Sequence, residues 1–164
     1  MTIEGQAREE AAFLRGPLSS LVGYALRRVQ ADLMSKLAAE LQSLRLRPVT
    51  FSVLAVIEAS HSPSQSDICA VLGIQRANFV AIAAELEEAG LIGRSQATHD
   101  RRQYILSLTR EGAARLKRAW RVVHAHEDRI DERLGAHGKK QLLALLERLD
   151  ASALWAEASA AVGS

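Results

Sequence analysis

The sequence predicts an all-α dominated fold with one small β-hairpin, organised as one structural domain. Apolar residues recur at three- and four-residue steps through most of the chain, as they do in amphipathic helices. One stretch, GRSQATHDRRQYILSLTREG at residues 93–112, instead alternates apolar and polar side chains after a charged tip, which is typical of a hairpin. The length of 164 residues and the apolar fraction of 48% suit a single buried core.

Two helices are expected before any other element. Pro17 suits the first turn of a helix, where the N–H that it lacks would be unpaired anyway, and apolar residues follow at helical spacing as far as Leu41. Pro48 likewise begins the segment PVTFSVLAVIEAS, which is apolar on nearly every side. The first helix is therefore predicted to be amphipathic and the second to be buried.

Two short helices joined by a glycine come next. Ser64 and Asp67 form a capping-box-like start, and Gly73 provides a stop because glycine adopts left-handed backbone angles without steric cost. Gly90 ends the second of these helices. The residues expected to be buried are Ile68, Val71, Leu72, Phe79, Ile82, Ala83 and Leu86. This pattern is typical of a helix-turn-helix.

The opposite face of that second helix has a polar first turn and a middle of small residues. Its members are Gln75, Arg76, Ala77, Asn78, Val80 and Ala81. In a major groove, arginine can bind guanine and asparagine or glutamine can bind adenine, each through two hydrogen bonds. Glu85, Glu87 and Glu88 lie at the far end, away from phosphates. The same pattern also fits a solvated helix packed on a core, so this motif alone leaves both interpretations open.

The hairpin is predicted to pair residues 92–95 with residues 103–108 around a tip at residues 96–102. A β-ribbon that follows a helix-turn-helix is a wing, and an arginine at its tip can enter the minor groove of DNA. Asp100 would repel phosphate, so we expect it to hold an arginine in position through a charge-assisted hydrogen bond. The alternative is a solvated hairpin with a surface ion pair worth under ~1 kcal/mol. The position after the two short helices favours DNA binding.

Basic charge is concentrated around this hairpin. Residues 94–121 carry eight basic and two acidic side chains, whereas the whole chain has a net charge of only +2. This local cluster therefore indicates a nucleic-acid partner more strongly than the global charge does. Cys69 is the only cysteine, the charged N-terminal sequence does not resemble a signal peptide, and no apolar run is long enough to span a membrane. We expect a cytoplasmic protein with no membrane partner.

Two further helices are expected at the C-terminal end. Thr109 can cap the first, which is predicted to run over residues 110–133 and to end near Gly135. Gly138 is expected to precede the last helix, whose apolar side consists of Leu142, Leu145, Leu146, Leu149 and Trp155. The first and last helices carry more leucine surface than one small lobe can cover, which indicates an interface. A two-fold dimer would place two recognition helices about one DNA turn apart, on a near-palindrome.

This arrangement resembles the MarR family of bacterial winged-helix regulators. The resemblance rests on SQSDICAVLGIQRANFVAIAAELEEAGLIGR and on DRRQYILSLTREG, which looks like the family's wing signature of an Asp, paired arginines, an aliphatic strand and Leu-Thr-x-x-Gly. It implies a homodimer with two winged helix-turn-helix lobes. We expect an N-terminal arm and first dimerisation helix in residues 1–47, the winged helix-turn-helix in residues 48–108, and C-terminal dimerisation helices in residues 109–164.

The resemblance also assigns the DNA contacts. The residues at the major-groove end of the recognition helix are Gln75, Arg76, Ala77 and Asn78. Asp100, Arg101 and Arg102 fall at the wing tip, with Arg102 the first choice for the minor groove and Asp100 its positioner. Gln75 departs from the Asp-like cap that is common in the family, and Ala77 and Asn78 stand where hydroxyl residues are common. The resemblance therefore implies the mode of binding but not the operator sequence.

The resemblance also implies a small-molecule effector. The chain is then expected to be a ligand-responsive transcriptional regulator, a repressor that the effector releases from DNA. The candidate lining residues are Tyr24, Arg28, Phe51, Glu58, His61, Trp120 and His124. An arginine beside aromatic side chains suits an aromatic carboxylate or its coenzyme A thioester. The aromatic residues equally suit a plain core or interface.

Several alternatives stay open at the level of sequence. Cys69 could sense peroxide, although no local cluster of basic residues activates it, and His124 with Asp128 and nearby His126 could hold zinc, although two ligands are weak evidence. A winged helix can also bind a protein partner instead of DNA. We expect no cofactor, no metal and no enzymatic activity, because the sequence contains no P-loop, dinucleotide motif or nucleophile elbow.

Overall fold

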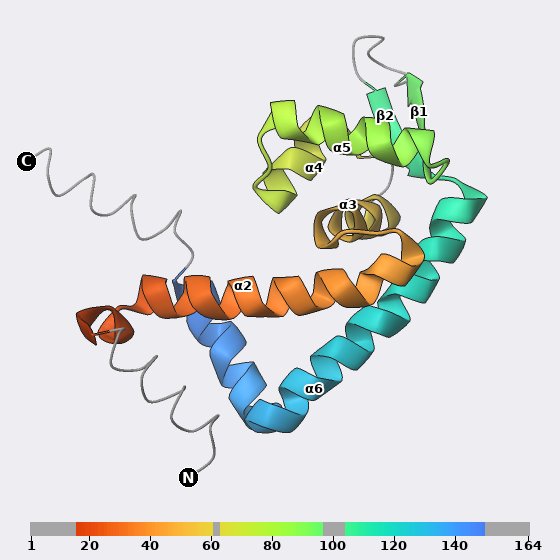
Figure 1. Ribbon diagram of the computed structural model, residues 1–164. Coiled ribbons are helices and arrows are strands. Elements are labelled where there is room, and N and C mark those ends of the chain that lie inside the picture. Colours follow the sequence, from red (N-terminus) through yellow and green to blue (C-terminus); the bar gives the residue numbers. More distant parts are fainter. Residues whose placement is uncertain (1–15, 61–62, 97–103, 150–164) are drawn as a thin grey trace, which may run out of the picture. The chain divides into compact units, whose positions relative to one another are not determined.

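The computed structural model describes residues 16–60, 63–96 and 104–149, shown as ribbons in Figure 1. In chain order their elements are η1 (Gly16–Ser20), α2 (Val22–Leu41), η2 (Gln42–Leu44), α3 (Pro48–Ala59), α4 (Gln65–Leu72), α5 (Arg76–Glu88), β1 (Ile92–Gln96), β2 (Tyr104–Leu108) and α6 (Arg110–Arg148). The predicted fold class, mainly helical with one small hairpin, is confirmed. Two compact units contain these elements, residues 1–119 and residues 120–164, and α6 runs from the first into the second.

The core of the first unit is built around α3. This helix begins at Pro48 as predicted, and its first turn is fixed by Thr50, whose hydroxyl oxygen accepts a hydrogen bond from the Arg47 backbone N–H at 2.8 Å. The fully buried side chains Val53 and Leu54 lie at its centre. It contacts α2 on one side and α4 and β2 on the other, so it links the long first helix to the small lobe (Figure 1).

The two short helices form as the sequence predicts. The Ser64 hydroxyl accepts a hydrogen bond from the Asp67 backbone N–H, and the Asp67 carboxylate accepts one from the Ser64 backbone N–H at 2.8 Å. These bonds lower the pKa of Asp67, so their stabilisation is present above the carboxyl group's unfolded pKa and is lost as pH falls through the folded one. Gly73 then ends α4 in the left-handed conformation, with φ of 62°.

The predicted buried face of these helices is confirmed except at Val71 and Leu72, and Leu72 is half-buried. Ile68 is buried on α4, and α5 buries Phe79, Ile82, Ala83 and Leu86. Val71 is 68% exposed, because it lies on a flank of α4 that no other described element covers. A two-turn helix presents too narrow a stripe for all three apolar residues that the sequence assigned to its buried side.

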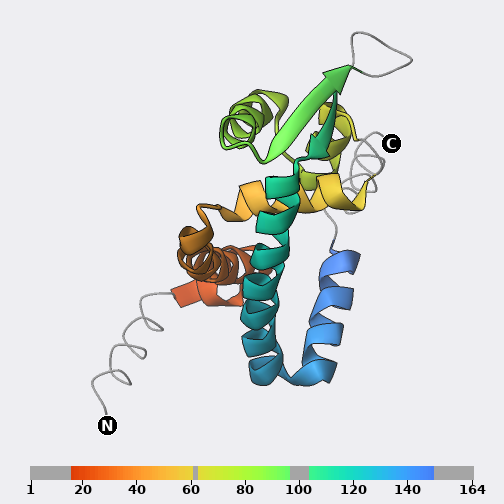
Figure 2. The same cartoon turned by 90° about the vertical axis from the view of Figure 1, so that its right-hand side faces the viewer.

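The wing is an antiparallel pair of strands whose register runs from Ile92 opposite Leu108 to Gln96 opposite Tyr104. Each strand differs from its predicted bounds by one residue, and the tip at residues 97–103 lies outside the described residues. The Leu106 backbone N–H donates a hydrogen bond to the Pro63 carbonyl oxygen at 3.1 Å, which ties the ribbon to the start of α4. Figure 2 shows the ribbon beside α5, on the side of the unit away from α2.

A compact junction joins the end of α5, the base of the wing and the start of α6. The Thr109 hydroxyl caps α6 by accepting from the Gly112 backbone N–H at 2.9 Å, and it donates to the Gly90 carbonyl at 2.7 Å. The Thr109 backbone N–H donates to the Leu91 carbonyl at 3.0 Å. A Cβ on Gly112 would lie 1.9 Å from that same Leu91 oxygen, so only glycine fits. The capping role of Thr109 was predicted, whereas the need for Gly112 was not.

Helix boundaries at the two ends of the described chain differ from the predictions. A short 3-10 turn at residues 16–20 precedes α2, so Pro17 opens that turn and the long helix begins at Val22. At the C-terminal end Gly135 breaks α6 with φ of 68°, as predicted, but Gly138 lies inside the continuing helix. One glycine with left-handed φ is sufficient for the turn, and a second interior glycine costs only about 1 kcal/mol. Trp155 lies outside the described residues.

Across the described residues, no single helix is long and apolar enough to cross a membrane. The helices α4 and α5 meet the length and composition criteria only when they are taken together, across a bend of 113°.

The junction generates the first prediction. We expect Gly112→Ala to lower the free energy of unfolding by about 3 kcal/mol, and the melting temperature by ~6–12 °C, because the new methyl group must displace backbone. Thermal unfolding followed by circular dichroism measures the change. Gly93→Ala is the matched control, since a Cβ there meets only the Ser107 hydroxyl at 3.8 Å. Equal stability of both variants would contradict the close approach.

Candidate nucleic-acid interface

The outer face of α5 is available to a partner. All six residues predicted on it are exposed, namely Gln75, Arg76, Ala77, Asn78, Val80 and Ala81. Gln75 stands at the N-cap position in an extended conformation, yet its side chain forms no capping hydrogen bond. Among the described residues, no side-chain hydrogen bond or ion pair engages Arg76 or Asn78 either. The polar groups in the first turn of α5 therefore remain free to bind a ligand.

The acidic end of α5 is neutralised by arginines from two other elements. Glu85 forms an ion pair with Arg47, which precedes α3. Glu87 forms one with Arg94 of β1 at 3.1 Å, and the Arg94 guanidinium also lies 5.4 Å from the centre of the Tyr104 ring of β2. Negative charge on α5 is thus both remote from its first turn and partly compensated. The second pair also attaches the wing to the recognition helix, a contact that the sequence did not reveal.

The wing-tip residues Asp100, Arg101 and Arg102 lie outside the described residues, so their assignment stays a prediction. The strands that carry the tip are described, and β1 lies directly against α5. The first turn of α5 and the hairpin therefore belong to one packed lobe, as a winged helix-turn-helix requires.

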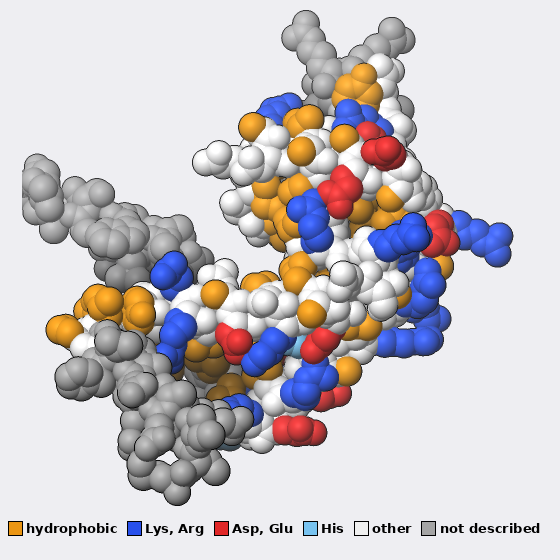
Figure 3. Space-filling view, in the orientation of Figure 1, with side chains coloured by type: hydrophobic (Ala, Val, Ile, Leu, Met, Phe, Trp, Pro, Cys, Tyr) orange, Lys and Arg blue, Asp and Glu red, His pale blue; other side chains and the backbone are white. Residues whose placement is uncertain are grey.

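Some of the described basic side chains in residues 94–121 are paired with glutamates, and others are not. Arg115 and Arg118 both lie beside Glu111, at 2.9 Å and 3.4 Å, and Arg94 is paired with Glu87. Arg110 and Lys117 are exposed and form no ion pair among the described residues. Figure 3 shows Lys and Arg side chains, in blue, gathered where the first part of α6 runs in Figure 1. The unpaired positive charge here is therefore smaller than the count of basic residues implies.

The candidate effector residues are distributed over both units. In the first unit Tyr24 is half-buried and Arg28 exposed on α2, while Phe51 is buried and Glu58 exposed on α3. His61 lies outside the described residues. The second unit brings Trp120 and His124 together, with their rings stacked and their centres 5.4 Å apart.

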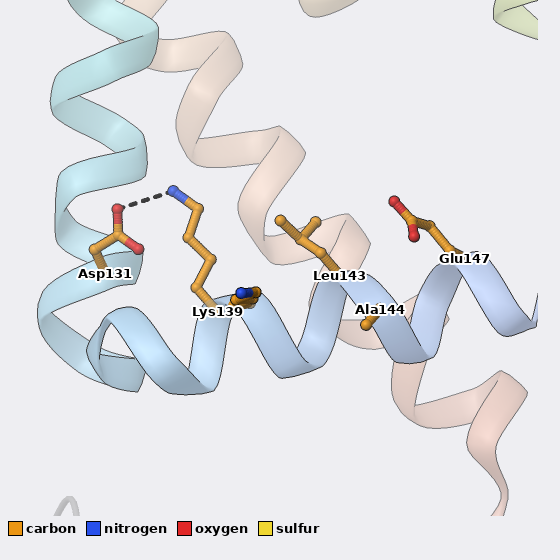
Figure 4. A pocket seen from close by; sticks show the side chains of 6 residues that line it. Asp131, Lys139, Leu143, Ala144 and Glu147 are labelled. Carbon is orange, nitrogen blue, oxygen red and sulfur yellow. Dashed lines mark hydrogen bonds and ion pairs between the residues drawn. The ribbon is translucent and has the colours of Figure 1, made fainter.

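An open cavity of about 470 Å³ lies in the second unit, on residues that the sequence analysis did not single out. Its lining residues are Asp131, Lys139, Lys140, Leu143, Ala144 and Glu147. The Lys139 ammonium lies 2.9 Å from Asp131, across the bend at Gly135 (Figure 4). It also lies 3.1 Å from Glu127. The pKa of Lys139 is raised, mainly by its hydrogen bond to Asp131 and to a smaller extent by the one to Glu127. This ion pair spans the bend that Gly135 makes, and spacing alone could not reveal it, because the turn brings the partners together.

The geometry supports neither of the two alternative sensing mechanisms, metal binding at His124 and Asp128 or peroxide sensing at Cys69. The described residues contain no group of three His, Cys, Asp or Glu side chains that could hold a metal ion, so His124 and Asp128 lack a third ligand there. Cys69 is half-buried. No described cysteine lies nearby as a resolving partner, because the chain has only this one.

Comparison with known proteins gives a consistent set of relatives. The sequence profile described as the MarR family matches residues 46–103, which extend from the start of α3 into the wing tip. The HTH-type transcriptional repressor Rv2887 of Mycobacterium tuberculosis is 30% identical over 128 residues, which cover 78% of this chain and 92% of that protein.

Two similar solved structures are of the transcriptional repressor CouR. One, bound to a 23-mer DNA duplex, is 40% identical with a TM-score of 0.79, covering 82% of this chain and 96% of that one. The other, bound to p-coumaroyl-CoA, is 40% identical with a TM-score of 0.74, covering 80% and 93%. Fold and sequence therefore agree over most of both chains.

Proposed function

This chain belongs to the MarR family of transcriptional regulators, and on that premise we propose that it represses transcription by binding operator DNA as a homodimer until an effector releases it. The single observation that carries the proposal is the exposed first turn of α5, where the side chains of Gln75, Arg76 and Asn78 form no hydrogen bond or ion pair with other described residues. Such a turn at the N-terminal end of a recognition helix can read base edges in a major groove.

The DNA contact combines two kinds of recognition. Arg76, Asn78 and Gln75 enter the major groove and select bases, since each can form paired hydrogen bonds with one base type. Arg102 at the wing tip enters the minor groove, with Asp100 as its positioner and Arg101 near the backbone. The DNA-bound CouR structure, at 40% identity, supports the same docking for this chain.

Dimerisation follows from exposed leucines on the first and last described helices. Leu18 of η1, Leu21 just before α2 and Val22 at its start lie exposed, and Figure 3 shows a patch of hydrophobic side chains at this end of α2. The exposed apolar side chains after the bend in α6 are Leu142, Leu143, Leu145, Leu146 and Leu149. Apolar surface of this extent indicates an interface, and a second copy of the chain would cover it.

The effector is an aromatic carboxylate or the coenzyme A thioester of such an acid. Tyr24 and Arg28 stand four residues apart on one face of α2, and Trp120 and His124 are spaced in the same way on α6. Arg28, one helical turn from the ring of Tyr24, suits an aromatic acyl group with an anionic carrier. The CouR structure bound to p-coumaroyl-CoA supports this ligand class.

A dimer test comes first, because the DNA geometry depends on it. Leu145→Asp should convert the dimer to a monomer in sedimentation velocity, since a carboxylate in an apolar interface is costly. Lys140→Asp introduces the same side chain on another face of the same helix and should leave the dimer intact. A wild-type chain that sediments as a monomer at micromolar concentration would refute the dimer.

The proposed roles of Asn78 and Arg102 predict two different losses of affinity for DNA. Asn78→Ala should weaken binding to the chain's own upstream DNA by about 1–3 kcal/mol and leave binding to random DNA unchanged, because it removes a base contact. Arg102→Ala should weaken both kinds of DNA alike. Fluorescence anisotropy titrations at several salt concentrations measure both effects. Affinity that is independent of salt would favour a protein partner over DNA, because phosphate contacts release counterions.

Effector binding is tested with p-coumaroyl-CoA as the probe. It should release the protein from its upstream DNA and raise the melting temperature, because it binds the folded state. Arg28→Ala should weaken this response at least tenfold in effector concentration, as expected when a charge-assisted contact of about 1.5–3 kcal/mol is lost. The adjacent Arg27→Ala, on another face of α2, should respond as the wild type does. Identical responses of all three proteins would remove Arg28 from the site.

A further inference from the structure

Val80 is an unusual residue for its position on α5. Its side chain is apolar, β-branched and 53% exposed, at a helical site where alanine is the better helix former. The residues around it on the outer face, Ala77, Ala81 and Ala84, are exposed alanines. Neither burial nor helix propensity therefore accounts for a valine here.

Val80 lies on the outer face of α5, so its side chain can contact a partner that binds there. Phe79, Ala83 and Leu86 are fully or almost fully buried, so they define the side of the helix that faces the core. Val80 follows Arg76 by four residues and Ala77 by three, which places it one turn further along the face that carries the free polar groups. A partner that binds Arg76 from outside the lobe therefore also reaches Val80.

The outer face of α5 around Val80 carries positive charge and no carboxylate. The part of α5 from Arg76 to Val80 contains no acidic residue, and Glu85 and Glu87 further along are paired with Arg47 and Arg94. The surface around Val80 thus combines a cation with an apolar group. The major groove of DNA offers the matching combination, because its base edges carry hydrogen-bonding groups on every base pair and one apolar group, the C5-methyl of thymine.

We propose that Val80 is a specificity-determining residue that contacts a thymine methyl group in each half of the operator. This inference rests on the proposed function and adds a base identity to it. Side chains four residues apart on a helix lie about 5–6 Å from each other, and base pairs are stacked about 3.4 Å apart. The thymine therefore lies one or two base-pair steps from the base that Arg76 contacts.

The experiment removes the methyl group from the DNA and leaves every hydrogen-bonding group in place. Each thymine of the footprinted upstream site is replaced in turn by 2′-deoxyuridine, and the affinity of the full-length protein is measured by fluorescence anisotropy. One thymine in each half-site should show a loss of about fourfold, the value expected for one buried methyl group. The other substitutions should leave the affinity unchanged.

Two variants assign that loss to a side chain. Val80→Ala should bind the thymine and deoxyuridine operators equally well, and its melting temperature should equal or exceed that of the wild type, because the residue is exposed and alanine favours the helix. Val71→Ala is the matched control, since Val71 is 68% exposed but belongs to α4. It should keep the full preference for thymine.

The outcomes separate this inference from the function on which it rests. A wild-type protein that binds its operator but tolerates every deoxyuridine substitution would overturn the role of Val80 and leave the repressor proposal standing. A preference for thymine that persists in Val80→Ala would assign the methyl contact to another residue. Absence of specific DNA binding would instead refute the proposed function.

Discussion

The Leu91 carbonyl oxygen is the point on which the arrangement of the lobe depends. It accepts the Thr109 backbone N–H, and the first turn of α6 approaches it so closely that only glycine fits at position 112. Thr109 also joins Gly90, at the end of α5, to the cap of α6. The recognition helix, the base of the wing and the first turn of α6 are therefore joined within a few residues. A displacement of α6 at this junction would also move α5 and the wing, which is what the proposed release by an effector requires.

Electrostatics then decides which part of the lobe can approach DNA. The glutamates of α5 lie at its C-terminal end, and two of them are paired with arginines from the start of α3 and from β1. Exposed ion pairs of this kind contribute little to stability, so their importance lies in where they place charge. They compensate negative charge beside the proposed interface, and the Arg94 pair also joins the wing to α5. The first turn of α5 remains the part with free polar groups and no carboxylate.

Local chemistry in the sequence was sufficient for the elements and their ends. Pro48, the Ser64 cap, Gly73 and Gly135 each act within a few residues, so their effects could be predicted before any tertiary contact was known. Contacts between distant segments could not be predicted in the same way. The exposure of Val71, the pairing of Arg94 with Glu87 and the need for glycine at position 112 all depend on which elements pack together. The polar face of α5 was predicted from spacing, whereas the wing tip and His61 lie outside the described residues.

The central claim is that DNA contacts the exposed first turn of α5 and the wing of each lobe. Amide hydrogen exchange of the full-length protein, with and without a duplex from its own upstream region, tests this claim directly because it locates protection along the chain. We expect slower exchange in residues 75–81 and 97–103 when the duplex is present, and little change in α2. Unchanged exchange in both segments, with protection confined to the long helices, would contradict the account.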